Sequence, residues 1–112
     1  MKRLLLLLIC MLPLQLFAEN PIDDDCTFNG IPLKGKVYVY PSTGLENFKV
    51  GFAAQGTEDL KVLVKNFCDD QSNCGEWQFV DNPALADFTI AIVSTGLADF
   101  TISYFPIPGI NK

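Results

Sequence analysis

Residues 86–105 read ADFTIAIVSTGLADFTISYF, and this stretch decides the fold class. The string Ala-Asp-Phe-Thr-Ile occurs twice in it, starting at Ala86 and again 12 residues later at Ala98. In each copy the apolar residues alternate with smaller ones. In the first copy, Phe88, Ile90 and Ile92 therefore lie on one face of the extended chain. Alternation in a segment rich in Phe, Ile and Thr predicts a β-strand with one buried face.

The same pattern recurs along the chain in six short segments. These are residues 37–40, 50–53, 62–65, 77–80, 90–93 and 102–105. Their first residues are 13, 12, 15, 13 and 12 positions apart, so residues 37–65 align without a gap on residues 77–105. The shared strand phase and a shared turn glycine, Gly56 on Gly96, indicate an internal duplication. We therefore predict a compact all-β domain of about six short strands in two duplicated three-strand halves.

The beginning of the chain has the layout of a secretory signal peptide. Lys2 and Arg3 precede a long apolar run, and Ala18 supplies a small residue before the first polar ones. We expect residues 1–18 to be removed, residues 19–33 to form an N-terminal arm, and residues 34–112 to form a single β-rich repeat domain. The mature protein would then be periplasmic or extracellular and would not span the membrane. Lipidation at Cys10 is an alternative that the bulky Ile9 before it disfavours.

Composition excludes several classes of function. The 112 residues suffice for one domain and include 13 acids, 8 bases and no histidine, for a net charge of −5. An acidic chain is a poor partner for nucleic acid. Without histidine the commonest general base and zinc ligand are missing. There is also no Gly-x-Ser-x-Gly motif and no glycine-rich phosphate loop. We expect no enzyme activity, no catalytic residues, no cofactor and no metal site.

Acidic residues stand just before several of the predicted strands. Asp59, Asp87 and Asp99 take this position, and Asn47 takes it before a fourth strand. They could form a ladder of calcium ligands, but Asp and Asn at such places more often accept hydrogen bonds from the backbone of their own turn, and we favour that interpretation. The run at residues 23–25 is interpreted as a solvated tail.

Three cysteines follow the signal segment, and an oxidising compartment favours their pairing. Cys68 and Cys74 flank five residues of the one interval that is longer than its neighbours. We favour a bridge between these two, which would staple the loop that joins the halves. The alternative joins Cys26 to Cys68 or Cys74 and pins the N-terminal arm. Either pairing leaves one thiol over, free and buried or paired between molecules.

The repeated units resemble those of a known family. The segments at 36–39, 77–80, 86–93 and 98–105 are similar to the repeats of the septoil knot domain family, small bacterial domains whose short strands follow an Ala-Asp-aliphatic lead-in and include one tryptophan-bearing unit. The resemblance covers roughly residues 34–105. It implies a β-rich domain whose backbone winds into a seven-crossing torus knot, and it implies no activity, because the family has no established function. The linkers and the cysteine-bearing loop depart from the family's pattern.

Function is therefore expected to be non-enzymatic. The leading hypothesis is a small exported β domain with a structural or binding role toward a protein or another envelope component. The alternative is a module that binds protein or glycan through exposed aromatic residues, for which the candidates are Tyr38, Tyr40, Trp77 and Tyr104. A hydrolase that uses carboxylates is a third hypothesis, and it requires a pocket in which acids converge.

Overall fold

Each of the six predicted segments forms a strand. The computed structural model describes residues 20–111. Its long strands are β3 (Gly35–Tyr40), β4 (Phe48–Phe52), β5 (Leu60–Val64), β6 (Glu76–Val80), β7 (Phe88–Ile92) and β8 (Phe100–Tyr104). Three two-residue strands and two short 3₁₀ turns were not predicted, namely β1 (Thr27–Phe28), β2 (Ile31–Pro32), β9 (Gly109–Ile110), η2 (Pro83–Leu85) and η3 (Thr95–Leu97). The all-β fold class is confirmed.

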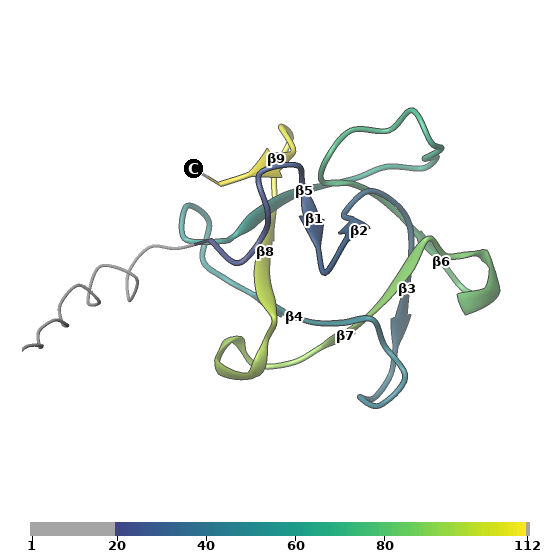
Figure 1. Ribbon diagram of the computed structural model, residues 1–112, viewed down its shortest axis with the longest axis horizontal. Helices are drawn as coiled ribbons and strands as arrows, with labels where there is room; N and C mark the ends of the chain where they lie inside the picture. Colours follow the sequence, from purple (N-terminus) through teal and green to yellow (C-terminus); the bar gives the residue numbers. More distant parts are fainter. Residues whose placement is uncertain (1–19, 112) are drawn as a thin grey trace, which may run out of the picture.

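The six long strands form a closed parallel barrel. Their order is β6-β3-β7-β4-β8-β5, and β5 pairs with β6 to close the ring, seen almost end-on in Figure 1. Strands of the first half (β3, β4, β5) alternate around the ring with strands of the second half (β6, β7, β8). The chain thus makes one circuit of the barrel with β3, β4 and β5. It then makes a second circuit in which β6, β7 and β8 fill the gaps between the strands of the first. Since parallel neighbours need crossover connections, each linker returns along the outside of the barrel.

The inward side chains form three layers that follow the duplication. The first layer, at the amino ends of the strands, holds Gly35, Phe48, Leu60, Gly75, Phe88 and Phe100. The second layer holds Val37, Val50, Val62, Trp77, Ile90 and Ile102. All residues of these two layers are buried. The third layer, at the carboxyl ends, holds Val39, Phe52, Val64, Phe79, Ile92 and Tyr104, and all six are partly exposed.

The N-terminal arm closes the amino end of the barrel. Ile22, Cys26 and Leu33 belong to the buried core. The ring of Phe28 packs on the first layer, with centroids 5.3 Å from Phe48 and 5.5 Å from Phe100. Figure 1 shows β1 and β2 within the outline of the ring. The described part of the arm therefore shares one core with the barrel that follows it.

The acids before the strands join neighbouring strands. Asp87 Oδ2 accepts a hydrogen bond of 2.8 Å from the amide of Lys36, and the amide of Asp87 donates back to the Lys36 carbonyl at 2.7 Å. Asp99, Asp59 and Asn47 make the same reciprocal contact with Lys49, Thr101 and Thr89. The expected backbone hydrogen bonding is confirmed, but the expected partner was wrong. Each side chain bonds the adjacent strand of the barrel, because the interleaved topology brings that strand beside it.

Candidate binding surfaces

The disulfide joins the arm to the barrel. Cys26 pairs with Cys74 across 48 residues, with Cα atoms 5.9 Å apart. The favoured Cys68–Cys74 bridge was therefore wrong, and one form of the alternative is correct. The physical reason lies in the barrel: Cys74 directly precedes first-layer Gly75, at the end that the arm closes. Cys68 is free and buried, and its thiol donates to the Glu76 carbonyl at 3.5 Å.

The four predicted binding aromatics do not form one surface. Trp77 is fully buried in the second layer, where its indole Nε1 donates to the Leu33 carbonyl at 3.1 Å, so its assignment as a binding residue was wrong. Tyr38 and Tyr40 lie on the outer wall, half-buried, with ring centroids 4.9 Å apart. Only Tyr104 belongs to the partly exposed third layer. Burial raises the pKa of the Tyr104 phenol above its usual value.

The third layer forms an apolar ring around the open carboxyl end of the barrel. We call these six residues, Val39, Phe52, Val64, Phe79, Ile92 and Tyr104, the mouth ring. Each side chain is between 37% and 46% exposed. Because all six strands are parallel, their carboxyl ends lie on the same side of the barrel, and the rings of Phe52 and Tyr104 touch edge to face at 5.5 Å. Sequence reasoning missed five of the six, although each is the third member of an alternating triad.

Few charges surround the mouth ring. The residues that directly follow the six strands are Pro41, Ala53, Lys65, Asp81, Val93 and Phe105. The one base among them, Lys65, forms an ion pair of 3.7 Å with Glu76. The acids that precede the strands lie at the opposite end, and residues 23–25 belong to the arm that closes that end. The chain therefore presents an apolar face with little charge at one end and an acidic face at the other.

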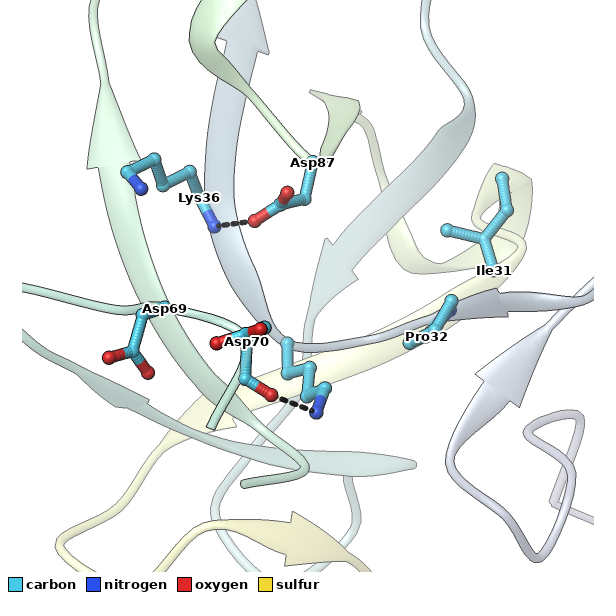
Figure 2. Close-up of a pocket in the computed structure, with 7 residues that line it drawn as sticks. Ile31, Pro32, Lys36, Asp69, Asp70 and Asp87 are labelled. Atoms are coloured by element: carbon cyan, nitrogen blue, oxygen red, sulfur yellow. Dashed lines mark hydrogen bonds between the residues drawn. The ribbon is translucent and has the colours of Figure 1, made fainter. Parts of the chain in front are cut away.

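A concave surface lies beside the amino end of β3. A cavity of about 420 Å³ is lined by Ile31, Pro32, Lys34, Lys36, Asp69, Asp70 and Asp87, as Figure 2 shows. Several of its polar groups already have partners. Lys34 Nζ donates to the Asp70 carbonyl at 3.2 Å, Asp87 is held by the Lys36 amide, and Asp69 Oδ1 accepts from the amide of Gln71 at 2.9 Å.

The carboxylates of the cavity in Figure 2 are open to solvent. Asp69, Asp70 and Asp87 are exposed to solvent. Within residues 20–111, no group of three or more Cys, Asp or Glu side chains is placed to hold a metal ion.

The expected signal peptide lies outside the described residues. Within the described part of the chain, no helix is long and apolar enough to cross a membrane.

Comparison with known proteins gives one match. Residues 30–107 match the model of a family described as the 7(1) septoil knot domain. That match covers both circuits of the barrel and the last four residues of the arm, 30–33. No curated protein and no solved structure matches the chain.

Proposed function

This chain belongs to the septoil knot domain family, and because that family has no established activity, we propose its function from the surface of the barrel. The protein is an exported, non-enzymatic domain that binds the apolar surface of another envelope protein through the mouth ring. The observation that carries this proposal is the exposed third layer: six apolar side chains at one end of an otherwise filled and closed barrel. Contiguous exposed apolar surface of this kind often marks an interaction site.

The chemistry of the mouth ring favours a protein surface over a glycan. A sugar is recognised through hydrogen bonds as well as ring stacking, and five of the six side chains in the ring have no polar atom. Aromatic residues such as Phe52, Phe79 and Tyr104 are enriched in the cores of protein interfaces. The low charge around the ring also lets an acidic protein approach a partner at this end without strong repulsion.

The area available predicts a transient contact. Complete burial of one such side chain contributes about 1.5–3 kcal/mol. About two-fifths of each mouth-ring side chain is exposed, so burying the exposed part of all six contributes about 5 kcal/mol in total. Association costs a comparable amount in lost translational and rotational freedom. The mouth ring alone therefore supports weak binding, and a partner that also covers the flanking loops would bind more tightly.

The rest of the barrel supports a rigid structural role. The amino end is closed by an arm that a disulfide holds in place, and both interior layers are fully buried. A rigid surface loses little conformational freedom on binding. The signal-like residues 1–18 and the disulfide support export. Two interleaved circuits should also unfold slowly, which protects an exported protein from proteolysis.

Co-purification from the native envelope tests this function. The wild-type chain is compared with Phe52→Arg and Ile92→Arg in the mouth ring, and with Leu97→Arg, which adds the same charge at an exposed apolar site in η3. We expect one partner to be retained by wild type and by Leu97→Arg and lost by both mouth variants. Retention of the partner by both mouth variants would contradict the proposal, provided that Trp77 fluorescence shows all variants folded.

A further inference from the structure

The barrel is closed less completely between β5 and β6 than at its other seams. These two strands share two residue pairs, whereas every other seam of the ring has three or four. The backbone hydrogen bond nearest the mouth runs from the amide of Lys65 to the carbonyl of Trp77 at 2.7 Å. β6 continues for three more residues, and within the described chain residues 78–80 pair only with β3. The side of residues 78–80 that faces β5 is therefore an open strand edge at the mouth, and we call it the open edge.

The linker from β5 to β6 leaves this edge open because it turns away from the ring. The amide of Cys68 donates to the side-chain oxygen of Gln78 at 2.8 Å, on the outer face of β6. Phe67 is exposed and lies under the ammonium group of Lys36, on the outer face of β3. Figure 1 shows the linker outside the ring. The linker thus covers part of the outer face of β6 and does not run beside its edge.

The other half of the same seam is filled by an added strand. β9 pairs antiparallel with the amino end of β5, with Leu60 opposite Ile110 and Lys61 opposite Gly109. Gly75, directly before β6, lies so close to this strand that a Cβ there would be 2.9 Å from the Gly109 nitrogen. The seam thus accepts one extra strand at its amino half, and its mouth half is left without one in the described chain.

Phe79 carries the backbone groups that point out of the open edge. The amides and carbonyls of alternate residues point to the same side of a strand, so those of Phe79 point to the side on which Trp77 accepts from Lys65. Neither group has a partner across this edge within residues 20–111. Unpaired groups on a strand edge are a template for another extended chain. Because Phe79 also belongs to the mouth ring, the open edge and the mouth ring are continuous.

A concave surface of about 500 Å³ wraps around the carboxyl end of β6. It is lined by Phe79 on the inner face, by Gln78 and Val80 on the outer face, and by Asp81 and Leu85 beyond the strand. Asp81 is exposed and forms no ion pair within the described chain. A strand added here would place alternate side chains toward the mouth ring and toward the outer wall, with room for a basic side chain beside Asp81.

We propose that the partner of the mouth ring adds an extended segment as a strand to the open edge. This inference rests on the proposed binding function and names the form in which the partner binds. The backbone of the segment bonds the amide and carbonyl of Phe79, its alternate apolar side chains reach the mouth ring, and a lysine or arginine pairs with Asp81. The mouth ring alone supports weak binding, and these main-chain hydrogen bonds supply the additional contact.

Amide hydrogen exchange, measured by NMR on the full chain, tests the proposal. On this seam the Lys65 amide is bonded and the Phe79 amide is free, so in the protein alone we expect Phe79 to exchange much faster than Lys65. The probe is a blocked hexapeptide that alternates valine and threonine and carries one lysine. At saturation we expect it to slow exchange at Phe79 by at least about tenfold and to leave Lys65 unchanged.

Two sets of variants separate strand addition from other modes of binding. N-methylation of alternate peptide amides gives two isomers with the same side chains, and only one of them can still bond β6, so one should bind and the other should not. Asp81→Asn should weaken binding of the lysine peptide about two- to fivefold and leave a norleucine peptide unaffected. Asp24→Asn, which removes an exposed acid from the arm at the opposite end, is the matched control and should change neither.

The proposal is overturned by a Phe79 amide that exchanges as slowly as Lys65 in the protein alone, by equal binding of both N-methylated isomers, or by no peptide binding at about 10 mM. Slowing that rises with protein concentration alone would assign the edge to a second copy of this chain and would also overturn it. The peptide measurements need no native partner, so they are independent of the co-purification. In the captured complex, an unprotected Phe79 amide would leave the binding function standing and refute strand addition.

Discussion

The disulfide between Cys26 and Cys74 should supply a large part of the stability of the barrel. It closes a loop of 48 residues, and the chain-entropy relation assigns such a loop about 4 kcal/mol. A bridge between Cys68 and Cys74 would close a loop of about 6 residues and contribute only about 2 kcal/mol by the same relation. The double substitution Cys26→Ala with Cys74→Ala should therefore lower the free energy of unfolding by about 4 kcal/mol.

Urea unfolding followed by the fluorescence of Trp77 measures this effect. Trp77 is the one tryptophan of the chain and is fully buried, with its ring 5.4 Å from that of Phe88. With a denaturant slope of about 1.3 kcal/mol/M, the midpoint should fall by about 3 M. Cys68→Ala is the matched control and should change the midpoint far less, since that thiol is free. A loss below about 1 kcal/mol in the double variant, or a larger loss in Cys68→Ala, would refute the reasoning.

Three further predictions concern the strand junctions and the mouth. Gly35→Ala should destabilise the fold by more than about 2 kcal/mol, and Gly44→Ala by about 1 kcal/mol, in urea unfolding. Both glycines have positive φ, but only at Gly35 would a Cβ collide with the carboxylate of Asp87. Asp99→Ala should cost about 1 kcal/mol and Asp99→Asn less, because the amide oxygen can still accept the backbone hydrogen bond; equal losses would contradict this. The Tyr104 phenol should ionise above the usual pH of about 10 in a spectrophotometric titration, and because folding favours the protonated phenol, stability should fall as the pH rises through that range.

Local pattern was sufficient to predict the strands. The alternation in residues 86–105 is a property of neighbouring residues, and it placed β7 and β8 to within two residues. The offset between the two halves was also visible, because residues such as Phe48 and Phe88 occupy equivalent positions. These features depend on the period of an extended chain and not on which strands pair.

Contacts between distant strands could not be predicted in the same way. The alternation of the two halves around the ring is set by long-range pairing, which leaves no local signal. That topology decides that the first two members of the Phe88, Ile90 and Ile92 triad are buried and the third is at the mouth. It also brings Cys74 to the end that the arm closes, and it buries Trp77, whose side chain is of a type enriched among the residues that dominate binding energy.

Site-specific photo-crosslinking in the native envelope tests the binding function most directly. A photoreactive phenylalanine analogue replaces Phe52 in the mouth ring, or Leu97 in η3 as a control that is still more exposed. We predict a discrete adduct with one envelope protein from position 52 and none from position 97. The adduct should disappear when Ile92→Arg is added. Adducts from both positions alike, or from position 97 alone, would contradict the assignment of the mouth ring as the binding surface.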